Sequence, residues 1–507
     1  MNDNLYSLFE SRFPDDRNRP FIETETGKIY TYADLEQISG RYAHLLTRLG
    51  IEKGDRVAVQ VEKSPEAIFL YLACLRAGAV YLPLNTAYQK AEIDYFLHDA
   101  EPRVVVCRPE AVDWIGEIAA RAKVPHVLTL DQAGGGTLVE RSRDLDADYP
   151  TVAAARDDLA AILYTSGTTG RSKGAMMTHL NLASNALTLH QVWGFQADDV
   201  LLHALPIFHT HGLFVATNCV LLNGTGMLFL PRFDVDAIIR LLPRATVFMG
   251  VPTFYVRLLA DQRFTRDLVK HMRLFIAGSA PLLADTFNAF RERTGHTILE
   301  RYGMTETGML TSNPLHGERI AGSCGQPLPG VEVRIADDKG KILGTDEIGV
   351  IEVRGPNVFK GYWRMPEKTK AEFRPDGFFI TGDVGRIDAR GYVYISGRAK
   401  DLIISGGFNV YPKEVEDEID QMDGVAESAV IGVPHPDFGE GVVAVVQRRA
   451  GRHEPTGDAI IMRLKGRLAN YKVPKRVYFV DELPRNAMGK VQKNVLRERY
   501  KDAFTSS

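Results

Sequence analysis

From about residue 28 to residue 325, short apolar segments alternate with longer amphipathic ones. DRVAVQV is followed by PEAIFLYLACLRAG and then by AVYLPL, and later RLFIAG precedes LADTFNAFRERTG and HTILERYG. Such short apolar runs suit buried strands, and the longer segments have the spacing of amphipathic helices. Strands that alternate with helices are typical of parallel sheets covered by helices. The sequence therefore predicts an α/β fold whose large N-terminal part contains mostly parallel sheets.

The pattern changes after Gly330. VEVRIADDKGKILGTDEIGVIEVRG alternates apolar and polar residues around two turn sequences, which predicts antiparallel hairpins and a β-rich subdomain. Beyond GYVYISGRAKDLIISGG, helices beginning at KEVEDEID and AIIMRLKGRL and strands AVIGV and GVVAVV predict a small α+β domain. We therefore expect a large N-terminal domain over residues 1–398 and a small C-terminal domain over residues 399–507. The charged segment RAKD, from Arg398 to Asp401, is the expected hinge.

The composition excludes several classes of protein. Of the 507 residues, 45% are hydrophobic and 25% are charged, as in globular domains. The net charge of −3 provides no basic surface for nucleic acid and no polybasic signal for a membrane. No apolar run approaches the ~20 residues of a membrane span, and MNDNLYSLFESRFPDD at the start lacks the features of a signal or transit peptide. We expect a cytoplasmic protein without nucleic-acid or membrane partners.

The cysteines and histidines do not predict a metal site. Four cysteines are widely spaced along the chain: Cys74, Cys107, Cys219 and Cys324. We interpret them as small buried residues, because neither a disulfide framework nor a zinc cluster has such spacing. His209 and His211 lie in one short segment, PIFHTHG, with no further ligand in sight.

The segment YTSGTTGRSKG, residues 164–174, is rich in glycine and hydroxyl side chains. It follows LAAILY, a short apolar run that predicts a buried strand ending where the glycines begin. Glycines free the backbone N–H groups to point toward one anion, and Arg171 and Lys173 add positive charge, so polyphosphate is the expected ligand. The segment is not a Walker A loop, because Ser172 stands where that pattern needs its second glycine. The alternative is a polar surface turn.

Three further segments contain candidate binding or catalytic residues. YGMTETG follows the predicted strand HTILER, where the Thr305 hydroxyl and the Glu306 carboxylate suit a phosphate and its Mg²⁺; otherwise Thr305 caps a helix. TGD places Asp383 in a predicted turn, where its carboxylate suits ribose hydroxyls or only the turn itself. PRNAMGKVQK places Lys490 in a loop that begins at a proline, and no acidic residue lies four positions away. Lys490 therefore either reaches a substrate or is a solvated surface lysine.

These segments occur in one order: YTSGTTGRSKG, YGMTE, TGD, GRAKDLIISGGFNVYP and PRNAMGK. Together they resemble the adenylate-forming acyl-CoA synthetases, from about residue 25 to the C-terminus, and within that superfamily the malonyl-CoA synthetases. The resemblance implies two half-reactions. A carboxylate first attacks the α-phosphorus of MgATP to give an acyl-adenylate and pyrophosphate, and the thiol of coenzyme A then displaces AMP.

The resemblance also implies roles for individual residues. The β- and γ-phosphates would be bound by residues between Thr165 and Lys173: Thr165, Ser166, Gly167, Thr168, Thr169, Gly170 and Lys173. Thr305 would contact the α-phosphate, Glu306 would hold Mg²⁺, and Tyr302 with Gly303 would lie near adenine. Asp383 and Arg398 would bind the ribose hydroxyls. Lys490 would bridge the carboxylate, the ribose and the α-phosphate, so its loss should abolish adenylation while sparing thioester formation.

The same resemblance implies that the small C-terminal domain rotates after adenylation. Lys400 falls at the hinge position of the family, and Gly406 and Gly407 would line the pantetheine tunnel, where only a residue without a side chain permits close approach. Arg232, in LPRFD, is assigned to the coenzyme A side.

The acid is expected to bind among three segments: residues 207–211, 277–280 and 299–302. A guanidinium buried there, on Arg301, would cost several kcal/mol without a partner, and malonate would supply a second carboxylate. A charge-assisted pair of about 1.5 to 3 kcal/mol would favour malonate over acetate or propionate by about ten to a hundred fold. Ser279, His209 and Thr210 would complete the polar end. Methylmalonate remains an alternative substrate, and a salt bridge from Arg301 to Glu300 or Glu306 remains an alternative role.

Other functions stay open at this point. The chain could activate another short-chain or aryl acid, follow an oxidative luciferase-like branch, load a free-standing carrier protein, or bind nucleotide without catalysis. The chain ends shortly after PRNAMGK, which is expected to leave no room for a fused carrier domain. The expected partners are small molecules: a dicarboxylate, ATP with Mg²⁺, and coenzyme A. A lysine acetyltransferase and deacetylase acting on Lys490 are also expected, because acetylation would remove its charge.

Overall fold

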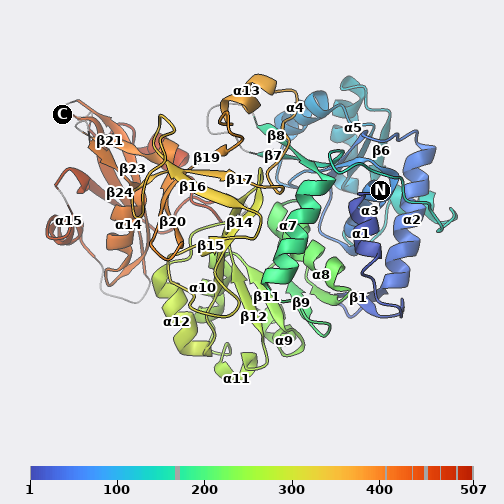
Figure 1. Cartoon of the computed structure of the whole chain (residues 1–507), viewed down its shortest axis with the longest axis horizontal. Helices are drawn as coiled ribbons and strands as arrows, with labels where there is room; N and C mark the ends of the chain where they lie inside the picture. Colours follow the sequence, from blue (N-terminus) through green and yellow to red (C-terminus); the bar gives the residue numbers. More distant parts are fainter. Residues whose placement is uncertain are drawn as a thin grey trace. The chain divides into compact units, whose positions relative to one another are not determined.

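The computed structural model describes residues 2–165, 172–405, 408–436, 438–449, 455–468, 470–486 and 489–504. These residues form two compact units. Unit 1 comprises Met1–Ala321, Gly325–Glu332 and Arg354–Gly377, and unit 2 comprises Gly322–Cys324, Val333–Val353 and Phe378–Ser507. Figure 1 shows the elements of both units, coloured along the sequence.

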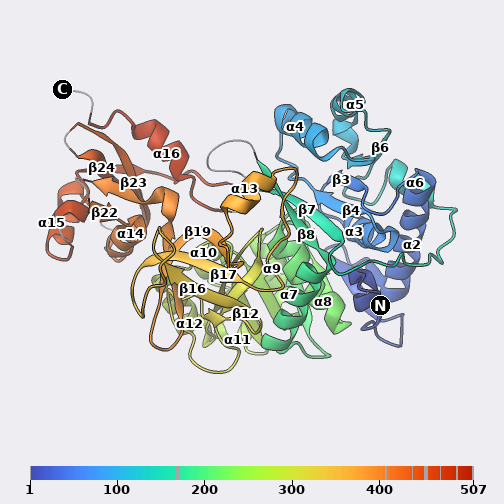
Figure 2. The same cartoon turned by 45° about the horizontal axis from the view of Figure 1, so that its top comes forward.

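Unit 1 contains a seven-stranded sheet with the order β18-β8-β7-β4-β3-β5-β6. Its strands are β3 (Arg56–Gln60), β4 (Val80–Pro83), β5 (Val104–Cys107), β6 (His126–Thr129), β7 (Leu159–Thr165), β8 (Lys173–Thr178) and β18 (Gly361–Tyr362). The strands from β7 to β6 are parallel, whereas β8 and β18 are antiparallel to their neighbours. Apolar side chains of α4 (Lys90–Ala100) and α5 (Val112–Arg121) pack on one face of this sheet. Figure 2 shows α2 (Tyr32–Arg48) and α3 (Pro65–Ala77) on the other side.

The sequence determines where α3 (Pro65–Ala77) begins and ends. The Ser64 side chain accepts a hydrogen bond from the backbone N–H of Ala67, and Pro65 occupies the first turn, where its missing N–H costs nothing. Gly78 ends the helix at φ 71°, a left-handed conformation that glycine adopts without strain. Every residue of α3 is buried, as its apolar sequence requires.

A second sheet of unit 1 has nine strands in the order β15-β14-β13-β12-β11-β9-β10-β1-β2. Its strands are β1 (Pro20–Thr24), β2 (Ile29–Thr31), β9 (Val200–His203), β10 (Gly226–Phe229), β11 (Val247–Gly250), β12 (Leu274–Ala277), β13 (Leu299–Met304), β14 (Gly308–Ser312) and β15 (Gln326–Pro327). The strands from β1 to β13 are parallel. Apolar side chains of three helices are buried against this sheet: α9 (Val235–Leu241), α10 (Pro252–Ala260) and α12 (Ala284–Thr294).

The helices of unit 1 connect these strands. They are α1 (Leu5–Glu10), α2 (Tyr32–Arg48), α3, α4 (Lys90–Ala100), α5 (Val112–Arg121), α6 (Thr137–Ser142), α7 (His179–Val192), α8 (Asn218–Asn223), α9 (Val235–Leu241), α10 (Pro252–Ala260), α11 (Arg266–Val269), α12 (Ala284–Thr294) and α13 (Pro366–Ala371). Short 3-10 helices occur at η1 (Pro109–Ala111) and η3 (Leu242–Arg244), and η2 (His211–Thr217) is a π-helix. Among the described residues, no helix is long and apolar enough to cross a membrane.

Unit 2 contains two sheets. The first has the order β16-β17-β19-β20, formed by β16 (Glu332–Ala336), β17 (Gly349–Arg354), β19 (Phe379–Ile387) and β20 (Val393–Arg398). The second is formed by β21 (Ile403–Ser405), β22 (Phe408–Val410), β23 (Val425–His435), β24 (Gly439–Arg448) and β25 (Arg476–Val480). The helical elements are η4 (Ala399–Asp401), α14 (Pro412–Asp420), α15 (Gly457–Lys465), η5 (Asn470–Lys472) and α16 (Lys493–Tyr500).

Strands β23 and β24 bury both of their faces. Val430, Val442 and Ala444 face α14 and α15, whereas Ala429 and Val443 face α16, as expected from the alternation of side chains along a strand. Figure 2 shows α16 and the pair α14 and α15 on opposite sides of these strands.

The α/β prediction with a β-rich part and a C-terminal α+β domain is confirmed, and the four cysteines are buried free thiols, as predicted. The structure excludes the alternative in which Thr305 caps a helix, because the chain turns at residues 305–307 and returns as β14, antiparallel to β13. One local prediction was wrong. Asp383 does not lie in a turn but within β19, because Gly382, at φ 73°, lets the strand bend and continue across a register shift.

Candidate active site

The carboxyl ends of three parallel strands bring polar side chains together in unit 1. The chain leaves β9 and reaches Thr210 and His211, it leaves β12 at Gly278 and Ser279, and it carries Arg301 on β13. Ligands of α/β proteins gather at this edge of the sheet. His211 begins the π-helix η2, a rare conformation that occurs frequently at functional sites.

Arg301 is buried, with 3% of its surface exposed. Its backbone pairs with Ser312 on β14, and its guanidinium lies over the backbone of Gly278. A Cβ atom on residue 278 would lie 2.3 Å from Arg301 Cζ, so a side chain at this position would displace the guanidinium. On the neighbouring residue, a carboxylate oxygen of Glu300 accepts a hydrogen bond from the backbone N–H of Leu282.

Ser279 adopts a backbone conformation that a serine rarely takes. Its φ is +72°, in the left-handed region, where a residue with a Cβ costs on the order of 1–3 kcal/mol. The Ser279 Oγ lies 3.2 Å from His211 Nδ1. Such strain persists where the surrounding structure fixes it, and it clusters at binding and catalytic sites.

His211 is a neutral imidazole beside Arg301. Burial, reinforced by the positive charge of Arg301, holds the pKa of His211 well below its usual value. Its backbone N–H donates to Nδ1 of His209. The buried atoms Thr210 Oγ1 and His211 Nε2 have no hydrogen-bond partner among the described residues. Because buried polar atoms in native proteins are almost always satisfied, this pair indicates a place for a polar ligand.

A buried lysine fixes the segment that leads into η2. Lys63 Nζ lies 2.9 Å from Nδ1 of His203, the last residue of β9, and burial holds the pKa of Lys63 well below its usual value. His203 Nε2 donates to the carbonyl oxygen of Gly212 at 2.9 Å, so its Nδ1 accepts from Lys63. Sequence reasoning missed Lys63 and His203, because nothing near either residue in the chain signals the other.

The predicted phosphate-binding segment connects β7 to β8. Thr165 pairs with Lys173 across this hairpin. Lys173 Nζ lies 3.1 Å from an oxygen of Glu372 and 4.1 Å from the centre of the Tyr362 ring. The predicted residues between them lie outside the described part of the chain: Ser166, Gly167, Thr168, Thr169 and Gly170.

Glu306 belongs to the same group of side chains. It is buried, and its Oε1 accepts a hydrogen bond at 3.1 Å from the hydroxyl of Tyr362, which also lies 2.7 Å from Glu372 Oε2. Burial and the two carboxylates raise the pKa of Tyr362. Burial alone would raise the pKa of Glu372, but hydrogen bonds from Lys368, Tyr362 and Lys173 lower it. Sequence reasoning missed Tyr362 and Glu372, since they lie in a segment without a recognisable motif.

This donor set fits a magnesium ion. The carboxylates of Glu306 and Glu372 share one hydroxyl proton from Tyr362, and the Thr305 hydroxyl stands next to Glu306 in the chain. Carboxylate and hydroxyl oxygens are ligands that Mg²⁺ prefers when it also binds phosphates. On the same hairpin, Tyr302 is buried, and a Cβ at Gly303 would lie 2.1 Å from the carbonyl oxygen of Gly308.

The remaining predicted residues fall into two groups. Arg232 of unit 1 is exposed and follows β10. In unit 2, Asp383 and Arg398 are opposite each other on β19 and β20, and Arg398 Nε lies 2.7 Å from an Asp383 oxygen. Lys400 is exposed in η4 and Lys490 is exposed in a loop before α16. Gly406 and Gly407 lie outside the described residues.

Comparison with known proteins places the chain among characterised relatives. Residues 9–363 match the AMP-binding enzyme family, and residues 414–490 match the AMP-binding enzyme C-terminal domain. The chain is 37% identical to a feruloyl-CoA synthase of Amycolatopsis sp over 94% of each chain. It is 37% identical to the mitochondrial malonate–CoA ligase of Mus musculus, over 93% of this chain and 87% of that protein. It is 59% identical to ATP-bound MatB from Rhodopseudomonas palustris, with a TM-score of 0.97 over 99% of this chain and 100% of that one.

Proposed function

The chain belongs to the AMP-binding enzymes and is an AMP-forming acyl-CoA ligase, and we propose that the acid it activates is malonate, with methylmalonate as a second substrate. The products would be malonyl-CoA, AMP and pyrophosphate. A malonate–CoA ligase is among the relatives that are similar over nearly the whole chain. A feruloyl-CoA synthase is equally similar, so overall identity does not choose between a dicarboxylate and an aryl acid.

The observation that carries the proposal is the burial of Arg301 beside His211 and Ser279. One carboxylate of malonate would pair with the Arg301 guanidinium, leaving the other for ATP. Thr210 Oγ1 and His211 Nε2 would meet the bound carboxylate as hydrogen-bond partners. A charge-assisted pair contributes about 1.5 to 3 kcal/mol, which corresponds to a preference over acetate of about ten to a hundred fold. An aryl acid would leave Thr210 Oγ1 and His211 Nε2 without a hydrogen-bond partner among the described residues.

In the first half-reaction, a carboxylate oxygen attacks the α-phosphorus of ATP, and the bond from that phosphorus to the β-phosphate oxygen breaks. We assign Thr165, Lys173 and the residues between them to the β- and γ-phosphates. Thr305 would donate to the α-phosphate, and Glu306, supported by Tyr362 and Glu372, would hold Mg²⁺. When bound, Mg²⁺ neutralises charge on the phosphates. Lys173 would exchange its ion pair with Glu372 for one with the departing pyrophosphate.

We assign further roles to residues of unit 2. Asp383 would accept hydrogen bonds from the ribose hydroxyls with Arg398 beside it, Tyr302 and Gly303 of unit 1 would lie by the adenine, and Lys490 would bridge the two reacting anions. We propose a boundary between residues 398 and 399, with Lys400 as the hinge. Rotation there would bring Gly406 and Gly407 to the pantetheine chain in the second half-reaction, in which the thiolate sulfur attacks the acyl carbon and AMP leaves. Arg232 would contact coenzyme A.

The test measures pyrophosphate release from ATP with malonate, methylmalonate, acetate, propionate and 4-coumarate, with and without coenzyme A. Native protein should prefer malonate, and Arg301→Met should lose that preference because methionine keeps a long unbranched side chain but not the charge. Arg319→Met, a half-buried arginine elsewhere in unit 1, serves as the control. A dominant rate with 4-coumarate or acetate would show that Arg301 is structural and that malonate is the wrong acid.

A further inference from the structure

Hydrogen bonds join the two sides of the loop that carries Lys490. Arg485 and Val491 form an antiparallel bridge, and the N–H of Asn486 donates to the carbonyl oxygen of Lys490 at 2.9 Å. The N–H of Gly489 donates back to the carbonyl oxygen of Asn486, also at 2.9 Å. Gly489 has a φ of 74°, so position 489 needs a residue that adopts the left-handed conformation without strain.

The peptide group between Gly489 and Lys490 is held on both sides. Its N–H, on Lys490, donates to Asn486 Oδ1 at 3.0 Å, and its carbonyl oxygen, on Gly489, accepts from Arg485 Nη1 at 2.8 Å. Because a peptide group is planar, holding both of these atoms fixes the direction in which the chain enters the Cα of Lys490. The long lysine side chain then begins from a defined point.

Arg485 is itself anchored to the central strands of unit 2. Its Nη2 forms an ion pair with Glu427 of β23, and both side chains are less than one-third exposed. Glu427 is the register partner of Gln447 on β24, and Gln447 Oε1 accepts a hydrogen bond from the N–H of Leu483 at the start of the loop. Two neighbouring residues of the sheet therefore hold the loop at Leu483 and, through Arg485, at Gly489.

We propose that the Glu427–Arg485 ion pair positions Lys490 for adenylation. This inference rests on the function proposed above, in which Lys490 bridges the reacting carboxylate and the α-phosphate. Arg485 and Glu427 are positioning residues, because they act on Lys490 through the Gly489 carbonyl and make no contact with substrate themselves. Their contribution belongs to the first half-reaction only, since Lys490 acts only there.

Arg485→Gln and Glu427→Gln should each slow adenylation by about tenfold to a hundredfold, the loss expected when a catalytic group is displaced by about 1 Å. The double variant should be no slower than the slower single variant, because both changes break one connection. Arg485→Lys keeps the charge and one donor, so it should recover part of the rate. Thioester formation from the chemically synthesised acyl-adenylate and coenzyme A should stay at the native rate.

The experiment measures both half-reactions for each variant of the full chain, with pyrophosphate release for the first and thioester absorbance for the second. It uses whichever acid the native chain adenylates fastest, so an error in the malonate assignment does not affect it. Arg467→Gln is the control, because its ion pair with Glu418 also lies in unit 2 but is distant in sequence from the loop.

Equal losses in both half-reactions would overturn the inference by showing a general structural role. Normal adenylation by Arg485→Gln beside an inactive Lys490→Ala would also overturn it, while leaving the proposed function intact. Full adenylation by Lys490→Ala would overturn the proposed role of Lys490, and the inference with it.

Discussion

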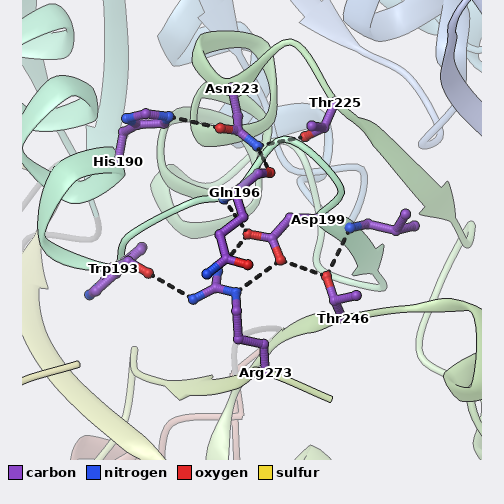
Figure 3. A network of polar contacts seen from close by, with 9 residues as sticks. His190, Trp193, Gln196, Asp199, Asn223, Thr225, Thr246 and Arg273 are labelled. Carbon is purple, nitrogen blue, oxygen red and sulfur yellow. Dashed lines mark hydrogen bonds and ion pairs between the residues drawn. The ribbon is translucent and has the colours of Figure 1, made fainter. Parts of the chain in front are cut away.

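Polar side chains at the two ends of the parallel strands in the nine-stranded sheet differ in how fully they are hydrogen-bonded. At the amino ends, Asp199, Thr246 and Arg273 immediately precede β9, β11 and β12 and bond to one another (Figure 3). Arg273 donates to both oxygens of Asp199, at 2.9 and 2.6 Å, and Thr246 Oγ1 donates to Asp199 at 2.7 Å. Arg273 also donates to the carbonyl oxygen of Trp193, so both sides of the carboxylate–guanidinium pair have further partners.

At the carboxyl ends, the polar groups are not all satisfied. Thr210 Oγ1 and His211 Nε2 are buried and have no hydrogen-bond partner among the described residues, and Ser279 holds a strained backbone. A satisfied network stabilises the fold, whereas an unsatisfied one costs stability unless a ligand completes it. The difference indicates that the amino-terminal edge contributes stability and that the carboxyl-terminal edge contributes binding.

The largest expected effect comes from breaking the hydrogen-bonded network at the amino-terminal edge. Arg273→Met leaves Asp199, which is 3% exposed, without its guanidinium, and removing one partner of a buried pair costs about 3 to 5 kcal/mol. Urea denaturation should show this loss, while the adenylation rate per folded molecule stays native. Arg263→Met removes the ion pairs of an exposed arginine with Asp236 and Asp261 and should cost far less, because solvent screens such pairs. Similar losses for the two variants would contradict the stabilising role of the amino-terminal edge.

The second prediction tests whether the carboxyl-terminal edge binds the substrate. Gly278→Ala places a methyl group where the Arg301 guanidinium now lies, so the guanidinium must shift. The preference for malonate over acetate should fall by about tenfold or more, while the KM for ATP is unchanged. Gly116→Ala, in α5, is the control, because a Cβ there meets nothing within 4 Å. An unchanged preference for malonate in Gly278→Ala would show that Arg301 does not select the substrate.

A matched pair of substitutions compares the two edges directly. Thr246→Val removes the donor to Asp199 and the acceptor for the Val200 N–H, and should cost about 1 to 3 kcal/mol. Thr210→Val removes a hydroxyl without a protein partner among the described residues, so the free energy of unfolding should change little or rise. Thermal unfolding without ligand measures both. Equal destabilisation by the two variants would show that both edges are structural.

The smallest expected effect concerns pH. The pKa of His211 in the folded protein lies well below the value of about 6.5 that an unfolded histidine has. Below about pH 6.5 the unfolded chain therefore binds a proton that folded His211 does not, so stability falls as pH falls, by up to about 1.4 kcal/mol per pH unit. His211→Gln should reduce this slope in unfolding measurements between about pH 6.5 and 5. A slope unchanged in His211→Gln would mean that His211 accepts a proton in the folded protein.

Much of the fold could be predicted from local patterns. The apolar run LAAILY is the core of β7, and PEAIFLYLACLRAG contains α3, including the Gly78 that ends it. Strand and helix periods are properties of neighbouring residues, so they are visible in the sequence. The turn predicted at Asp383 was wrong, because whether a glycine ends a strand or bends it depends on the strand that pairs with it. That pairing is not a property of neighbouring residues.

The candidate site could be predicted only in part. The family resemblance indicated the segments that contain Arg301, Ser279 and Thr210. It did not indicate the contact of Lys173 with Glu372, 199 residues away, or that of Lys63 with His203, 140 residues away. Such contacts have no local signature, because the order of strands in a sheet decides them. The same holds for Arg485 and Glu427, which are 58 residues apart and meet only because the loop returns to β23.

The sequence by itself determined the order of strands and helices, the glycine-rich segment, and the family to which its motifs belong, because periodicity and motif spacing are local. The tertiary structure decided which charges are buried, which are paired, and which polar atoms remain for a ligand. These properties depend on burial and on distances between strands far apart in the chain, and burial sets both the cost of a charge and the strength of its contacts. For that reason Arg273 and Arg301 look alike in the sequence, yet one stabilises the sheet and the other faces Gly278 at the site.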